Sequence, residues 1–122
     1  MSRDLGPAWL GKVRRAALTL KATTRGASRG GQSVYVVLLH DSRRAEPWGL
    51  YVGQTSRDPD LRFDQHKTGY KASGAARRFG VRLLPDLVAH LNPMRRWEAL
   101  DLEAALAEAF RAVGVPWVEG GH

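Results

Sequence analysis

Two tyrosines, an arginine and a histidine stand at spacings that suit phosphodiester chemistry. Tyr35 and Tyr51 each lie in a short run of strand-forming residues, and Arg62 and His66 are four residues apart, on one face of a predicted helix. Hydrolysis of a phosphodiester requires a deprotonated water, positive charge beside the phosphoryl oxygens and assistance to the leaving oxygen. Phenol, guanidinium and imidazole groups can together supply these functions.

Glu103 is the acidic residue most suited to bind a metal ion. Its helical neighbours are all apolar, namely Ala99, Leu100, Leu106, Ala107 and Phe110. Glu98 and Glu108 instead have charged neighbours, so both are expected to lie in solvent as helix-surface charges. A buried carboxylate needs a partner, which is either a metal ion or a base such as Arg62. The two tyrosines favour the metal ion.

The segments around the tyrosines predict an antiparallel hairpin. Residues 33–40 are almost all β-branched, aromatic or leucine, and residues 48–53 follow after a polar loop. Tyr51 alternates with Gly49 and Gly53 on its face of the second strand. These glycines predict an open surface at which a ligand or a helix can approach the ring.

The remaining elements are predicted to be helices and short strands. Asp58 is typical of a helix N-cap and Pro59 of the first helical position, and Gly69 is typical of a helix end. A helix is therefore predicted between them. Later elements are expected at residues 81–84 (strand), 94–113 (helix) and 117–118 (extended). The sequence therefore predicts an α/β (α+β) sandwich, with a small, mostly antiparallel three-stranded central sheet flanked by helices.

Residues 1–32 are predicted to be a basic N-terminal extension, helical or partly disordered, that precedes a compact domain at residues 33–122. Apolar residues alternate there with lysines and arginines, and a Gly/Ser/Arg linker follows. The extension either lies along a phosphate backbone, docks on the domain or is partly disordered.

Composition limits the classes of function. The formal charge of +7 makes nucleic acid the leading partner class. The absence of cysteine excludes disulfides, thiolate metal sites and a thiol nucleophile. No apolar run approaches the ~20 residues of a membrane span and no signal peptide is evident, so a cytoplasmic protein that does not enter a membrane is expected. The basic residues expected to contact nucleic acid are Arg14, Arg15, Lys67, Lys71, Arg77 and Arg78.

The segments Val34-Tyr35-Val36 and Tyr51-Val52-Gly53 resemble the two signature tripeptides of the GIY-YIG nuclease family. The resemblance extends to Arg62, His66 and Glu103 and spans residues 33 to about 118. It implies a metal-dependent endonuclease that cleaves DNA. It also implies a single Mg²⁺ or Mn²⁺ ion held by Glu103.

Roles follow for each group. Tyr35 is the expected general base, although its free pKa of about 10 is too high unless Arg62 and a metal ion lower it. Tyr51 would hold the scissile phosphate or its water, and Arg62 would contact the nonbridging oxygens. His66 would orient Tyr35 or assist proton transfer.

The sequence departs from the family at its C-terminal end, where many members carry an asparagine. Glu119 or His122 would have to replace it. No separate specificity domain is evident, so the sequence leaves open whether the substrate is single-stranded, duplex or branched DNA, or RNA. The alternative function is a non-catalytic nucleic-acid-binding or complex-assembly module on the same scaffold. Retention of all five proposed catalytic residues argues against it.

Overall fold

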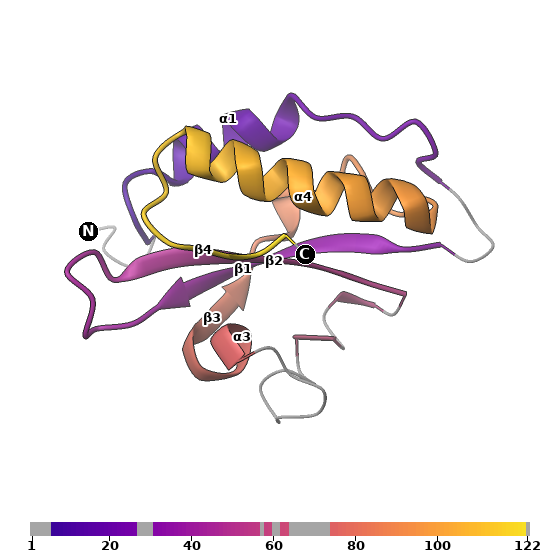
Figure 1. Cartoon of the computed structure of the whole chain (residues 1–122). Coiled ribbons are helices and arrows are strands. Elements are labelled where there is room, and N and C mark those ends of the chain that lie inside the picture. Colours follow the sequence, from indigo (N-terminus) through magenta and orange to yellow (C-terminus); the bar gives the residue numbers. More distant parts are fainter. Residues whose placement is uncertain (1–5, 27–30, 57, 60–61, 64–73, 122) are drawn as a thin grey trace.

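The central element of the protein is a four-stranded sheet with helices on both faces, seen in a computed structural model that describes residues 6–26, 31–56, 58–59, 62–63 and 74–121 (Figure 1). The strands are β1 (Ser33–His40), β2 (Trp48–Thr55), β3 (Gly80–Leu83) and β4 (Val118–Gly120). The helices are α1 (Leu10–Leu18), α3 (Gly74–Phe79), α4 (Arg96–Ala112) and the 3₁₀ helix η2 (Pro85–Leu87). This architecture confirms the predicted α+β class.

The order of the strands is β3-β1-β2-β4. β1 pairs antiparallel with β2, as in a hairpin, and antiparallel with β3 on its other side, whereas β4 pairs parallel with β2. The prediction of three strands was therefore wrong by one. The extended piece expected near Trp117 becomes a fourth strand because Leu50 donates its amide to the Trp117 carbonyl, at 2.9 Å.

β1 is buried on both of its faces. Its six residues from Val34 to Leu39 are each at most 2% exposed. Val34, Val36 and Leu38 face the core beneath α1 and α4, while Tyr35, Val37 and Leu39 face a second core that includes Phe79 of α3. Alternation along the strand thus gives β1 two different packing layers.

α1 packs against the main core of the protein. Val13 and Ala17 on its inner face are fully buried. The imidazole of His90 secures the end of the helix, since its Nε2 lies 3.0 Å from the Ala17 carbonyl and 3.1 Å from that of Leu20. Carbonyls only accept, so this nitrogen carries the hydrogen. Of the three alternatives for the N-terminal segment, docking is the one observed for α1.

α4 crosses the same face of the sheet as α1 (Figure 1). Alanine, leucine and glutamate dominate its sequence, and all three are strong helix formers. Gly114 has a φ of +100° after the last turn, a conformation that glycine adopts without strain, and the chain then turns back toward β4. None of the helices among the described residues is long and apolar enough to cross a membrane.

Candidate active site

The hairpin of β1 and β2 brings Tyr35 and Tyr51 together. Their strands pair so that Tyr35 lies opposite Gly53 and Tyr51 opposite Val37, which puts both rings on one face of the sheet. The ring centroids are 6.1 Å apart at an interplanar angle of 43°. Tyr35 is 2% exposed, whereas Tyr51 is partly exposed.

The glycines beside Tyr51 do not leave an open surface, so that expectation was wrong. A Cβ at Gly53 would lie 2.7 Å from the Tyr35 hydroxyl oxygen, and one at Gly49 would lie 2.5 Å from the Trp117 ring. The two glycines therefore make room for aromatic rings that lie across β2. The space they create is filled from within the protein.

Arg62 is hydrogen-bonded to Tyr35. Its backbone amide donates to the carbonyl of Asp58, four residues earlier, at 3.0 Å. This is the hydrogen bond of one helical turn, and the turn follows β2 along the chain. The guanidinium of Arg62 donates a hydrogen bond to Tyr35, and the hydroxyls of Tyr35 and Tyr51 are hydrogen-bonded to each other. Three of the five predicted catalytic residues thus form one connected group. His66 lies outside the described residues, as do Lys67, Lys71 and most of the helix predicted to hold them.

The environment raises the pKa of the Tyr35 hydroxyl above its ordinary value. Burial is the largest cause, and the neighbouring Tyr51 adds to it. Arg62 acts in the expected direction and lowers the pKa, but its effect is smaller than that of burial. Tyr35 therefore holds its proton at neutral pH in this structure, contrary to the lowering anticipated from Arg62.

Glu103 is buried, as its apolar neighbours predicted, with 6% of its surface exposed. It lies on α4, whose buried side contributes Leu102 and Leu106 to the main core on the face of the sheet opposite Tyr35. A Cβ at Gly121 would lie 3.7 Å from the Glu103 carbonyl, so this turn of α4 is next to the end of β4. Within the described part of the chain, no three His, Cys, Asp or Glu residues gather as metal ligands.

Glu98 does not lie in solvent, and that prediction was wrong. It is 6% exposed, and its carboxylate accepts four hydrogen bonds, from the amides and hydroxyls of Thr23 and Thr24. The hydrogen bonds from these threonines, that of the Thr24 hydroxyl foremost, lower the pKa of Glu98 to about 2. Its neighbours along α4 gave no sign of this role, because both partners come from a distant segment of the chain.

A cavity of about 220 Å³ opens beside Tyr35, at the edge of β1. Its walls are mainly apolar, with Asp58 and Asn92 as polar members. The Asn92 amide accepts a hydrogen bond from the Val34 amide and donates one to the Val34 carbonyl, each at 2.8 Å. Asn92 thereby takes the place of a neighbouring strand at the start of β1. The residues around Asn92 in the sequence do not predict this role, although an Asn-Pro pair is typical of a turn.

The predicted nucleic-acid-binding arginines divide between the two faces of the sheet. Arg77 and Arg78 are exposed on α3, on the tyrosine face. Arg14 and Arg15 are exposed on α1, on the other face, and Arg14 forms an ion pair of 2.7 Å with Asp86. Only the first pair is placed on the side of Tyr35.

Of the two proposed substitutes for the family asparagine, Glu119 lies beside Tyr51, its partner in the parallel pairing of β2 and β4. Glu119 accepts a hydrogen bond of 2.9 Å from the indole nitrogen of Trp117, and His122 lies outside the described residues. No protein family, curated protein or solved structure matches this chain.

Proposed function

We propose that this chain is a metal-dependent endonuclease of the GIY-YIG type, which hydrolyses phosphodiester bonds in DNA. The observation that supports the proposal best is the hydrogen-bonded group of Tyr35, Tyr51 and Arg62. A guanidinium directed at a buried phenol is more than a packing contact, because it places a fixed cation beside a potential proton acceptor. We also propose that it acts in the cytoplasm.

In this proposal, the deprotonated fraction of Tyr35 takes a proton from the attacking water, and Arg62 binds the nonbridging phosphate oxygens through its fork of donors. Tyr51 hydrogen-bonds the phosphate or the water. The partly exposed ring of Tyr51 lies on the solvent side of the pair.

Glu103 is the proposed ligand of the metal ion. Magnesium keeps several of its waters and is commonly bound through one or two carboxylates, so a single buried carboxylate fits it. The helix that carries Glu103 lies on the face of the sheet opposite Tyr35, so this assignment rests on the resemblance to the family and not on a contact with the tyrosines. An ion bound by Glu103 would neutralise charge on the leaving oxygen. Millimolar Mg²⁺ or Mn²⁺ should be required, since one carboxylate makes a weak site.

The test incubates the purified chain with end-labelled single-stranded, duplex and branched DNA, and with RNA, in Mg²⁺, Mn²⁺ or EDTA. Metal-dependent cleavage of DNA that Tyr35→Phe suppresses is the expected result. Cleavage that is equal in wild type and Tyr35→Phe would remove Tyr35 from the mechanism, and cleavage that is also equal in Glu103→Gln would point to a contaminating nuclease. No cleavage of any substrate would refute the proposed enzyme.

A non-catalytic nucleic-acid-binding module is the second candidate, and one observation favours it. Burial raises the pKa of Tyr35, which opposes its action as a base. DNA binding in EDTA without cleavage in either metal would select this alternative.

A further inference from the structure

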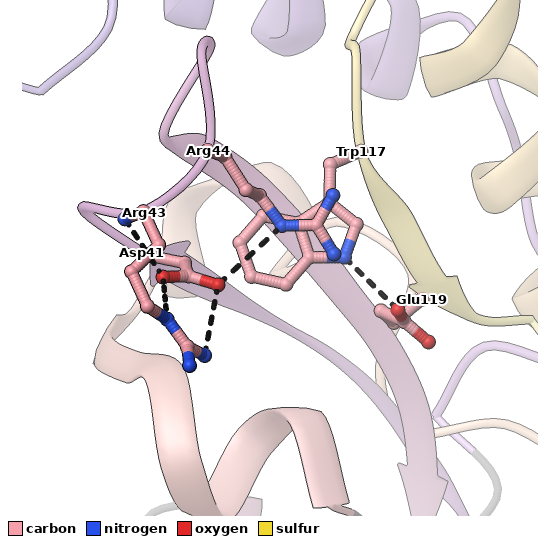
Figure 2. Close-up of polar contacts among 5 residues, drawn as sticks. All are labelled: Asp41, Arg43, Arg44, Trp117 and Glu119. Carbon is pink, nitrogen blue, oxygen red and sulfur yellow. Dashed lines mark hydrogen bonds and ion pairs between the residues drawn. The ribbon is translucent and has the colours of Figure 1, made fainter.

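An arginine in the β1–β2 loop lies flat on a tryptophan of the tyrosine face. The guanidinium carbon of Arg44 is 3.7 Å from the centroid of the Trp117 ring (Figure 2). Such a contact combines cation–π attraction with stacking of two planar groups. The Arg44 side chain is still 42% exposed, so one side of the guanidinium faces solvent.

Asp41 contacts both Arg44 and the neighbouring Arg43. Its carboxylate accepts hydrogen bonds from the amide and the guanidinium of Arg43, and lies 3.7 Å from Nε of Arg44 (Figure 2). Asp41 is 8% exposed, and these bonds, that from the Arg43 guanidinium first, lower its pKa. The loop therefore holds two cations beside one carboxylate.

Trp117 is itself held rigidly. Its indole nitrogen donates to Glu119, its ring meets Phe79 edge-on at 5.4 Å, and Gly49 provides the space beneath it. These three contacts hold the Trp117 ring on which Arg44 stacks. Arg44 pairs with Asp41 through Nε, at 3.7 Å, so a ligand can be bound through its two Nη groups.

The position of this stack relates it to the tyrosines. The Tyr35 ring lies over Gly53 and the Trp117 ring over Gly49, which are four residues apart on the same face of β2. That separation is roughly 13 Å at about 3.3 Å per residue, comparable with the rise of about four nucleotides along one strand of a duplex. A nucleic-acid strand at Tyr35 would therefore reach Arg44 a few nucleotides away.

We infer that the Arg44–Trp117 stack, with Asp41 and Arg43, is a phosphate-binding subsite for the strand that enters the tyrosine site. The exposed Nη edge of Arg44 offers two parallel donors, the geometry that a phosphate accepts. The Arg43 side chain is 69% exposed, and the guanidinium carbon of Arg78 on α3 lies 5.2 Å from the centre of the Phe79 ring. These two cations join Arg44 near Trp117, where the carboxylates of Asp41 and Glu119 offset part of the charge. This subsite rests on the proposed function for its orientation toward Tyr35, but it binds phosphate whether or not cleavage follows.

The test measures binding in EDTA, where cleavage is absent. Wild type, Arg44→Ala and Arg44→Lys are titrated against fluorescent single-stranded and duplex DNA of equal length, over a series of salt concentrations. Arg44→Ala should weaken binding roughly tenfold, as expected for a hydrogen bond to a charged group. The slope of log affinity against log salt should fall by about 0.7 on single strands or 0.9 on duplex. Arg44→Lys should keep the slope and lose affinity, since lysine retains the charge but not the planar fork.

Arg96→Ala is the matched control, because Arg96 is exposed in the first turn of α4 on the opposite face. It should bind as wild type does. Equal affinity and slope for Arg44→Ala and Arg96→Ala, or no binding of either probe at low salt, would overturn the subsite. Arg44-dependent binding without cleavage by wild type in Mg²⁺ or Mn²⁺ would leave the subsite standing and refute the enzyme.

Discussion

Glu98 on α4 binds Thr24, which lies 74 residues earlier, through two hydrogen bonds to a single oxygen. Oε1 accepts from the Thr24 amide at 2.7 Å and from its hydroxyl at 2.6 Å. Oε2 accepts the corresponding pair from Thr23, at 2.7 and 3.0 Å. The hydroxyl of Thr24 also accepts from the Arg95 amide at 2.8 Å. One carboxylate thus attaches the segment after α1 to the first turn of α4.

Replacing Glu98 should therefore lower stability. Glu98→Gln replaces one acceptor oxygen with an NH₂ group that faces donors, so two of the four hydrogen bonds are lost. The melting temperature should fall by several degrees. Glu108→Gln, at an exposed position of the same helix, is the control and should melt as wild type does. If both variants melt alike, the Glu98 contacts contribute nothing to the fold.

The same contact makes stability depend on acid. The pKa of Glu98 is lowered from 4.5 to about 2 by its hydrogen bonds, so the folded state binds this proton less readily than the unfolded state. Its stabilisation is present above pH 4.5 and is lost as the pH falls toward 2. Melting temperatures between pH 7 and pH 2.5 should show a decline in wild type that is smaller in Glu98→Gln. Parallel curves for the two proteins would contradict this linkage.

Tyr35→Phe should reduce cleavage about 10²–10⁴-fold while DNA affinity is unchanged, if Tyr35 is the general base. Since burial raises its pKa, only a small fraction is deprotonated at pH 7, and the rate of wild type should rise about tenfold per pH unit through pH 9. Rates in saturating metal, measured from pH 6 to 9, give the profile. A flat profile, or full activity in Tyr35→Phe, would transfer the role to Tyr51 or His66.

Glu103→Gln should abolish metal-dependent cleavage because it removes the ligand charge at nearly constant volume. The loss should be of the order of a thousandfold, corresponding to several kcal/mol of charge stabilisation by the ion. Glu108→Gln is the control, whereas Glu98→Gln is unsuitable because it weakens the fold. Activity in Glu103→Gln with the metal requirement intact would show that another group binds the ion.

Gly49→Ala should be destabilising by about 1–3 kcal/mol, the usual cost of overfilling a packed site. Its Cβ would lie 2.5 Å from the Trp117 ring and 2.7 Å from the Trp117 carbonyl oxygen. Gly74→Ala is the matched control, since no atom lies within 4 Å of a Cβ at that helical position. Chemical denaturation of both variants and of wild type gives the free energies of unfolding to be compared. Equal stability would mean that Trp117 moves freely, which would also weaken the proposed subsite.

Deletion of residues 1–32 should lower the melting temperature strongly. It removes the buried Val13 and Ala17 and leaves Glu98 without its threonine partners. Binding of the phosphate backbone by this basic segment has to be tested without unfolding the protein. Arg15→Gln does so, because Arg15 is exposed. An unchanged salt slope of DNA binding in Arg15→Gln would exclude that arginine as a phosphate contact, whereas a slope reduced by about 0.7–0.9 would identify one.

The sequence by itself determined the local elements and the burial of Glu103. Runs of β-branched and aromatic residues predicted β1 and β2, helix formers predicted α4, and both follow from preferences that act between near neighbours. The meeting of Tyr35 and Tyr51 on one face follows from the same logic, since a hairpin and a period of two fix it. The apolar residues three and four positions from Glu103 likewise predicted its burial.

Tertiary structure alone decided the features that depend on partners far along the chain. The neighbours of Glu98 along α4 predict an exposed charge on the helix surface. It is instead a buried hydrogen-bond acceptor, because Thr23 and Thr24, more than 70 residues earlier in the sequence, pack beside it. Gly49 and Gly53 suggested empty space until the rings of Trp117 and Tyr35 filled it. The pKa of Tyr35 depends on the balance between burial and Arg62, and burial is a property of the whole packed molecule. Local pattern gives the direction in which each side chain points, whereas desolvation and long-range hydrogen bonds arise only when the layers are assembled.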